Sequence, residues 1–212
     1  MSLLFGPVQQ LSQVFDGYQQ AVVGLRRIAD LLRTETTVAE RSDAIDPGGA
    51  RFTGDARLDD VAFRYSGASV DALGGIDLHI PAGTSLALVG RTGAGKSTIV
   101  KLLARFYDPT DGVVRMDGTD IRRFTLRGYR RHIGIVPQEP HLFTGTVADN
   151  IAYGRPDADR EQIAAAAAAV GATTMIAGLP GGMRHPIGER GAGLSSGPRQ
   201  LIALAPAELV EP

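Results

Sequence analysis

The sequence predicts an α/β fold that is preceded by a separate, long N-terminal helix. Three observations support this prediction. An apolar run at 85–89 leads into a glycine-rich turn and then into an apolar helical pattern at 99–106. Further apolar runs alternate with polar residues at the two-residue period of strands, as at 76–80. A seven-residue apolar repeat covers 1–34, and such a repeat is typical of a packed helix.

Composition excludes several classes of protein and of site. The chain has 212 residues, 43% of them hydrophobic, which is enough for one or two domains with a buried core. The formal net charge of -1 shows no basic excess, so we expect no nucleic-acid partner. The absence of cysteine excludes disulfides and thiolate metal sites. No apolar run approaches the roughly 20 residues of a membrane-spanning helix.

Residues 1–34 are expected to form one long helix. Its apolar side chains recur at spacings of three and four, and they are Val8, Leu11, Phe15, Tyr18, Val22, Leu25, Ala29 and Leu32. The first charged residue is Asp16. Two interpretations stay open from the residues alone: an amphipathic helix packed on its own domain, or the continuation of a membrane helix into the cytoplasm.

Residues 35–56 are interpreted as a linker. They carry many charges, the sequence Asp46-Pro47-Gly48-Gly49 and little apolar periodicity, all of which favour exposed, irregular chain. We therefore place a domain boundary within 35–56.

Strands are expected on both sides of the glycine-rich turn. The expected strands are at 58–65, 76–80, 85–89, 113–116 and 133–136. The apolar runs 85–89 and 133–136 are almost uninterrupted, so both are predicted to be buried strands. Asp117-Gly118 closes the strand at 113–116, as a turn should.

The turn after 85–89 carries the pattern G-x-x-x-x-G-K-[ST], which binds phosphate when it lies between a strand and a helix. Gly90, Gly93 and Gly95 allow a left-handed backbone close to a ligand, and the helix N-terminus supplies amide donors. Lys96 adds a positive charge, and the Ser97 hydroxyl is suited to hold Mg²⁺. The candidate phosphate-binding residues are Gly90, Arg91, Thr92, Gly93, Ala94, Gly95, Lys96, Ser97 and Thr98.

Residues 141–187 predict a helical insert. Helices are expected at 146–152 and 161–170, and the second contains six consecutive alanines, the strongest helix formers. A glycine-serine loop at 188–197 then leads into an apolar helix. Ser195, Ser196 and Gly197 could form a second anion site there. A simple helix cap by Ser195 or Ser196 is the alternative, and this stretch alone favours the cap.

Together these motifs resemble the nucleotide-binding domain of ATP-binding cassette (ABC) exporters, over essentially the whole chain. The phosphate loop matches the family's Walker A pattern. Tyr65, in the sequence VAFRY, matches the aromatic residue that stacks on adenine, and Gln138, in VPQE, matches the Q-loop glutamine. Residues 143–151 (FTGTVADNI) and 188–191 (GERG) resemble the segments after the Q-loop and before the family signature.

The resemblance implies a P-loop NTPase of ABC type, with an incomplete parallel core sheet, antiparallel strands and a helical subdomain. It implies that 1–34 is the cytoplasmic end of the last transmembrane helix, that 35–56 is a linker, and that 57–212 is the nucleotide-binding domain, cut before its Walker B strand. It places the chain at the cytoplasmic face of the membrane, as part of a transporter.

The resemblance also implies cofactors, partners and roles. ATP and Mg²⁺ are the implied cofactors. Lys96 and Gln138 would be catalytic, Ser97 and Gln138 would hold Mg²⁺, and Tyr65 would contact the base. Ser195, Ser196 and Gly197 would face the nucleotide of a second nucleotide-binding domain, either identical or different. The transmembrane domains of the exporter are the other implied partner.

Several positions depart from the family pattern. The signature L-S-G-G-Q is replaced by Leu194-Ser195-Ser196-Gly197-Pro198, in which Ser196 adds a Cβ and Pro198 removes an amide donor. Pro206 is expected to break or kink the helix that follows. The residues given include neither a Walker B aspartate nor the catalytic glutamate and switch histidine. We therefore expect a fragment that does not hydrolyse ATP by itself.

Three functions remain in competition. The first is the ATP-binding domain of an ABC exporter, which couples ATP binding and hydrolysis to transport. The second is a module that binds ATP without turnover, as a degenerate or truncated remnant. The third is another phosphate-loop NTPase such as a kinase or a GTPase, which Tyr65, Gln138 and the signature-like loop disfavour.

Overall fold

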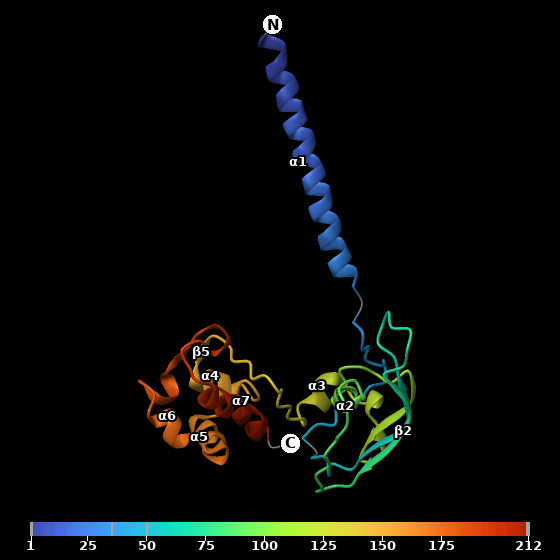
Figure 1. Ribbon diagram of the computed structural model, residues 1–212, viewed down its shortest axis with the longest axis vertical. Helices are drawn as coiled ribbons and strands as arrows, with labels where there is room; N and C mark the ends of the chain where they lie inside the picture. The colour runs from blue at the N-terminus through green and yellow to red at the C-terminus, as the bar shows by residue number, and fades with distance from the viewer. Residues whose placement is uncertain (1, 35, 50, 211–212) are drawn as a thin grey trace. The chain divides into compact units, whose positions relative to one another are not determined.

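The computed structural model describes residues 2–34, 36–49 and 51–210, with side chains inside the first helix from residue 10 onward. Val8 of the apolar repeat therefore lies outside the described side chains, as do the terminal residues 211–212 of the expected domain. The chain divides into two units, Met1–Ala39 and Glu40–Pro212. Figure 1 draws both units, and each is described by itself below.

The first unit consists mainly of helix α1, Ser2–Arg33, which is 32 residues long and confirms the long helix expected at the N-terminus. Its apolar repeat is largely exposed: 66% of Tyr18 and 81% of Leu32 are open to solvent. Only Val22 and Ala29 of the described repeat are half-buried. Among the described residues, no helix combines the length and the apolar character that crossing a membrane requires.

The second unit begins with an antiparallel sheet, in the spatial order β2-β1-β3-β4. Its strands are β1 (Ala56–Phe63), β2 (Leu73–Ile80), β3 (Asp111–Met116) and β4 (Thr119–Asp120). Leu58 lies opposite Leu78 on one side and Val114 on the other. The two-residue turn Asp117-Gly118 joins β3 to β4, with φ of 51° and 76°, as tight hairpins require. The strands expected near 58–65, 76–80 and 113–116 are thus confirmed.

Two helices contribute side chains to one face of this sheet. They are α2 (Lys96–Leu103) and α3 (Leu126–Arg130), with the short 3-10 helix η1 (Ile121–Arg123) before α3. Ile99 and Leu102 of α2 and Tyr129 of α3 lie in one buried cluster with Leu58 and Val61 of β1. We call residues 51–140, which contain this core, the phosphate-loop lobe.

The prediction of buried strands at 85–89 and 133–136 is wrong. Residues 85–89 and 133–136 are irregular chain, and neither belongs to a sheet in the described part of the molecule. Leu86, Val89 and Val136 are 47%, 88% and 51% exposed. An apolar run becomes a buried strand only when neighbouring strands exchange backbone hydrogen bonds with it and other elements cover the faces of the sheet. The antiparallel sheet supplies neither segment with such a neighbour.

The remaining residues, 141–210, form what we call the helical lobe. Its elements are β5 (Gly145–Thr146), α4 (Val147–Ala152), α5 (Arg160–Ala169), α6 (Thr173–Ala177), η2 (Gly182–Arg184), β6 (Pro186–Ile187), η3 (Glu189–Gly191) and α7 (Ser196–Val210). The helices expected at 146–152 and 161–170 are confirmed to within one residue. Figure 1 shows α4, α5 and α7 grouped together. Val147, Ile151, Ala167 and Ile202 are completely buried in their common core.

Helix α7 differs from what its prolines predict. Pro198 lies in its first turn, where a proline is tolerated. Pro206 was expected to break or kink the helix, yet α7 runs without interruption from Ser196 to Val210. Ile202, Ala205 and Leu209 are buried against the rest of the helical lobe. Burial of this face on both sides of Pro206 supports the helix through the position where one hydrogen bond is missing.

The irregular chain before β1 is tied to the phosphate-loop lobe. The Asp117 carboxylate accepts hydrogen bonds from the Thr53 hydroxyl (2.6 Å) and from the backbone amides of Thr53 (2.6 Å), Gly54 (3.1 Å) and Asp55 (3.0 Å). Burial alone would raise the pKa of Asp117, but these four donors outweigh it and lower that pKa. A turn residue therefore also anchors the segment that leads into the sheet.

Candidate phosphate-binding site

The glycine-rich loop has the backbone that its sequence predicts. Gly93 and Gly95 have φ of 85° and 83°, in the left-handed region, and Gly95 is the N-cap of α2. A Cβ at Gly95 would lie 2.5 Å from the Leu73 side chain and 3.0 Å from the Ala72 carbonyl oxygen. Position 95 therefore requires glycine for its conformation and for its close approach to β2. The result is a loop whose last residue opens directly into a helix N-terminus.

Lys96, the first residue of α2, extends back across the loop. Its ammonium donates to the carbonyl oxygens of Gly90 and Arg91, at 2.8 Å each. An ammonium has three donors, so one remains for another acceptor. The geometry places a fixed positive charge inside the loop, where an anion bound by the loop amides would lie.

A cavity of about 450 Å³ lies against this loop. It is lined by Tyr65, Ala72, Thr92, Gly93, Ala94, Gly95, Lys96, Ser97, Thr98 and Gln138. Tyr65 comes from the chain after β1, and Gln138 from the irregular segment at the end of the phosphate-loop lobe. Three separately predicted parts of the site thus meet at one cavity. Gly90 and Arg91, also predicted, shape the loop but do not line the cavity.

Tyr65 is held on several sides. Its hydroxyl lies 3.1 Å from the Thr98 hydroxyl on α2. Its ring contacts Phe63 and Tyr107 with centroids 4.8 and 5.3 Å apart and with nearly perpendicular planes. The Lys101 ammonium lies over the ring, 5.6 Å from its centroid. The sequence gave no functional role to Lys101; the signal available was its spacing of three from Thr98, on the same helix face.

The oxygen donors at this cavity fit Mg²⁺ better than a transition metal. The Ser97 hydroxyl and the Gln138 side-chain amide are both exposed at the cavity, and Mg²⁺ prefers oxygen ligands and keeps several waters. Within the residues that the structure describes, no group of three or more His, Cys, Asp or Glu side chains could hold a metal. Ser97 and Gln138 therefore suit an ion that is shared with a bound phosphate group.

The signature-like loop is not part of this cavity. Ser195, Ser196 and Gly197 are exposed, and α7 begins at Ser196. Arg199 stabilises the loop. Its guanidinium donates to the Leu194 carbonyl oxygen at 2.9 Å, and it lies so close to Gly191 that a Cβ added there would be 3.2 Å from Arg199 Nε. Sequence reasoning missed this role of Arg199. The three predicted residues face solvent, where a second molecule could reach them.

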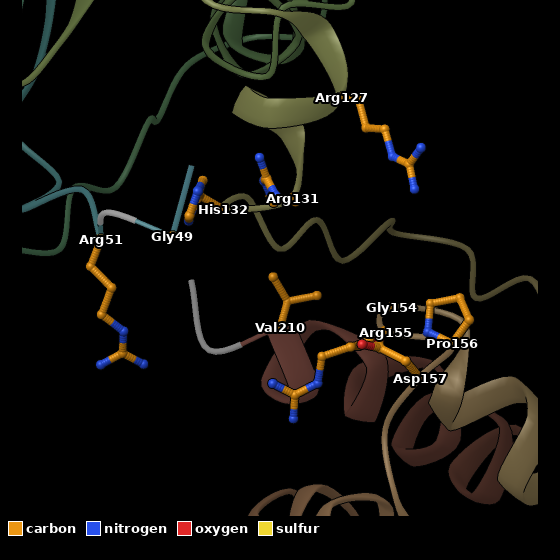
Figure 2. A pocket seen from close by; sticks show the side chains of 10 residues that line it. All are labelled: Gly49, Arg51, Arg127, Arg131, His132, Gly154, Arg155, Pro156, Asp157 and Val210. Atoms are coloured by element: carbon orange, nitrogen blue, oxygen red, sulfur yellow. The ribbon is translucent and has the colours of Figure 1, made fainter. Parts of the chain in front are cut away.

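Figure 2 shows another cavity, of about 550 Å³, whose lining is rich in arginine. The lining consists of Gly49, Arg51, Arg127, Arg131, His132, Gly154, Arg155, Pro156, Asp157 and Val210. Arg131 is paired with Asp46. In the close-up, the guanidinium groups of Arg51, Arg127 and Arg131 lie at separate points around the cavity instead of meeting at one. This cavity is basic, but it does not present the converging donors of an anion site.

Comparisons with known proteins show the family to which the chain belongs. A family model described as "ABC transporter" matches residues 73–212. The chain is 50% identical, over 212 residues, to a multidrug efflux ATP-binding/permease protein of Mycobacterium bovis (strain BCG / Pasteur 1173P2), and it covers 17% of that protein. It is 42% identical, over 210 residues, to an ATP-dependent lipid A-core flippase of Escherichia coli (strain K12), of which it covers 35%.

A solved structure, that of a bacterial Atm1-family ABC exporter with ATP bound, matches with a TM-score of 0.82 and 37% identity. The match covers all of this chain and 37% of that one. The chain thus spans between a sixth and somewhat over a third of the length of these three proteins.

Proposed function

Because the chain belongs to the ABC transporter family, we propose that it is the ATP-binding domain of an ABC-type exporter, in which ATP binding and hydrolysis drive transport across a membrane. One observation carries the proposal: the phosphate loop, Tyr65 and Gln138 line the same cavity. An aromatic ring and a phosphate loop in the lining of one cavity suit a ligand with a base and a phosphate chain.

ATP would be held through both its phosphates and its base. The loop amides and the free donor of Lys96 would bind the phosphates, where charge-assisted hydrogen bonds are the strong ones. Tyr65 would stack on adenine. A site with contacts to the base alone would not distinguish ATP from a nucleoside. A site with contacts to the phosphates alone would not distinguish ATP from inorganic phosphate. Recognition therefore requires the ring and the loop together.

Mg²⁺ would be bound next to the phosphates by the Ser97 hydroxyl and the Gln138 amide oxygen. When bound, it neutralises charge that develops on the transferred phosphoryl group. Ser97 is fixed by its place in the first turn of α2. Gln138 lies on irregular chain, so its approach to the cavity is adjustable. Lys96 would stabilise the phosphate oxygens, and Gln138 would help to orient the attacking water.

The rest of the chain would connect this site to a transporter. We propose that 1–34 continues the last transmembrane helix, that 35–56 is a linker and that 57–212 belongs to the nucleotide-binding domain. Ser195, Ser196 and Gly197, exposed at the start of α7, would face the nucleotide of a second such domain. The transmembrane domains would place the site at the cytoplasmic face of the membrane.

The second candidate function is ATP binding without turnover. Within the described residues, the cavity lining offers Lys96, Ser97 and Gln138 but no carboxylate. Hydrolysis needs a group that positions the attacking water, in addition to charge stabilisation. We therefore expect the 212-residue chain to bind ATP and to release phosphate no faster than its Lys96→Ala variant. Sustained release that Lys96→Ala abolishes would favour the hydrolysing form of the proposal.

Titration with a fluorescent ATP analogue tests the site. Lys96→Ala removes the charge inside the loop and should weaken binding at least about tenfold, since a hydrogen bond to a charged group contributes roughly 1.5–3 kcal/mol. Arg160→Ala, which removes a positive charge from the helical lobe, is the matched control and should bind as the unmodified chain does. Equal affinity of the Lys96→Ala variant and the unmodified chain would show that the ligand does not use this loop.

A further inference from the structure

Lys101 occupies a position that the proposed function leaves unused. It lies on α2, three residues after Thr98, so both side chains project from the same side of the helix. Both also contact Tyr65: the Thr98 hydroxyl lies 3.1 Å from the tyrosine hydroxyl, and the Lys101 ammonium lies 5.6 Å from the ring centroid. The chain has only two lysines, and the other is Lys96 at the phosphate loop.

The contact between Lys101 and Tyr65 has the geometry of a cation–π interaction. Such contacts need a cation within about 6 Å of the ring centroid, and the ring's negative face attracts the charge. Phe63 and Tyr107 contact the same ring with nearly perpendicular planes. The Tyr65 ring thus contacts Phe63 of β1, Tyr107 from the chain after α2, and two side chains of α2, the helix that begins in the phosphate loop.

We propose that Lys101 is a positioning residue that sets the specificity of the site for a purine base. The inference rests on the proposed function, because it assumes that Tyr65 stacks on the base. The ammonium over one face of the ring leaves the base to stack on the other face. It also draws electron density from the ring, which strengthens stacking on an electron-rich purine. Thr98 and Lys101 lie on α2, as does Lys96. Their contacts with Tyr65 therefore hold the ring at a fixed position relative to the phosphate loop.

This role differs from a general electrostatic one. A positive charge near the cavity would attract any polyphosphate, whatever base it carries. A charge that acts through the Tyr65 ring changes only the affinity for ligands that stack on this ring. The two roles are separated by comparing ATP, CTP and inorganic tripolyphosphate, which share the phosphate chain and differ in the stacking group.

The experiment measures the affinity of the 212-residue chain for these three ligands, by competition against a fluorescent ATP analogue. Lys101→Met keeps the length of the side chain and removes the charge, and Lys101→Gln is a second neutral variant in case the first does not fold. We expect either variant to weaken ATP binding about two- to fivefold, CTP binding less, and tripolyphosphate binding not at all. Lys101→Arg should restore the ATP affinity, since a guanidinium also stacks on aromatic faces.

Two controls sharpen the result. Arg64→Gln removes a positive charge one residue from Tyr65, on a side chain paired with Asp71 instead of a ring, and should leave the preference for ATP over CTP unchanged. In a Tyr65→Leu background, Lys101→Met should have no further effect on ATP affinity, because a double-mutant cycle isolates the coupling between the two residues.

Three results would overturn the proposal. Unchanged ATP affinity in both neutral variants would show that Lys101 does not act on the ring. Equal losses for ATP and tripolyphosphate would assign the effect to charge or to the stability of α2. Failure of the unmodified chain to bind either ATP or tripolyphosphate would refute the proposed function itself, and with it this inference.

Discussion

The helical lobe and the phosphate-loop lobe differ in how completely they bury their apolar segments. In the helical lobe, α4, α5 and α7 surround a core in which Val147, Ile151 and Ile202 are fully buried. The phosphate-loop lobe has an equally buried core on its antiparallel sheet, but two apolar segments, 85–89 and 133–136, are irregular chain and contribute only the partly buried Leu88 and Ile133 to it. Both lobes thus contain good core sequence, but the phosphate-loop lobe leaves two strand-like segments outside any sheet.

The difference follows from where each element finds its hydrogen bonds. A helix satisfies its backbone within one segment, so α5 needs neighbours only for its apolar face. A strand has no internal hydrogen bonds and depends on another segment at a defined register. β1, β2 and β3 find antiparallel partners in one another. The segments 85–89 and 133–136 have the composition of strands without such a partner in the described chain.

The largest expected effect on stability comes from comparing one isoleucine substitution in each lobe. Ile202, on α7, is 0% exposed, whereas Ile135 is 40% exposed. Ile202→Ala should lower the free energy of unfolding by about 2–5 kcal/mol, through lost burial and a residual cavity. Ile135→Ala is the matched control and should cost less than about 1 kcal/mol. Urea unfolding, followed by circular dichroism, measures both. A similar cost for the two would mean that the 133–136 segment is packed in solution.

The next largest effect on stability is expected for substitution of Asp117, in the phosphate-loop lobe. In Asp117→Asn, the side-chain oxygen can still accept hydrogen bonds, but the NH₂ group that replaces the other carboxylate oxygen would face donors such as the backbone N–H of Thr53. We expect a cost of about 1–3 kcal/mol at neutral pH. Because the pKa of Asp117 is lowered in the folded chain, its stabilisation is present above the unfolded pKa of about 4 and is lost as the pH falls below it.

The pH dependence provides the control for that prediction. Thermal unfolding should show the difference between Asp117→Asn and the unmodified chain at pH 7 and a smaller difference at pH 3. Asp111→Asn, at the exposed start of β3, should differ from the unmodified chain at neither pH. A difference for Asp117→Asn that grows as the pH falls would contradict the assigned protonation.

The smallest predicted effect concerns the start of α5. Asp159 and Gln162 form a capping box. The backbone amide of Gln162 donates to the Asp159 carboxylate at 2.8 Å, and the backbone amide of Asp159 donates to the side-chain oxygen of Gln162 at 3.0 Å. Asp159→Ala should lower the stability of the helical lobe by about 1 kcal/mol. Asp157→Ala, two residues earlier and outside the box, should be neutral in the same urea titration. Equal effects would show that the box does not stabilise α5.

The sequence predicted the local features of the fold well. The alanine run and the Asp117-Gly118 turn lie within single segments, and α4, α5 and the strand β3 form as expected. The phosphate loop is also local, which explains why Gly93 and Gly95 have the predicted left-handed backbone.

The sequence failed where structure depends on distant segments. The run Ser85–Val89 is apolar enough for a buried strand, but hydrophobicity does not reveal whether a partner strand is available. Pro206 is unfavourable in an isolated helix, and its tolerance depends on the burial of Ile202 and Leu209 against other elements. The contact between Lys101 and Tyr65 joins α2 to the chain after β1, so no single stretch of sequence shows it.

Hydrogen–deuterium exchange on the 212-residue chain tests the comparison between the lobes most directly, because protection reports whether each amide is hydrogen-bonded in a stable element. We expect the amides of 86–89 and 134–136 to exchange as fast as an unprotected peptide does, whereas the Ile133 amide donates to the Arg130 carbonyl oxygen at 3.1 Å and is left out of the comparison. The buried amides of α4 and α7, such as those of Ile151 and Ile202, should exchange slowly at the same pH and temperature. Protection of 86–89 equal to that of α7 would contradict the account, because it would mean that this segment is a paired strand.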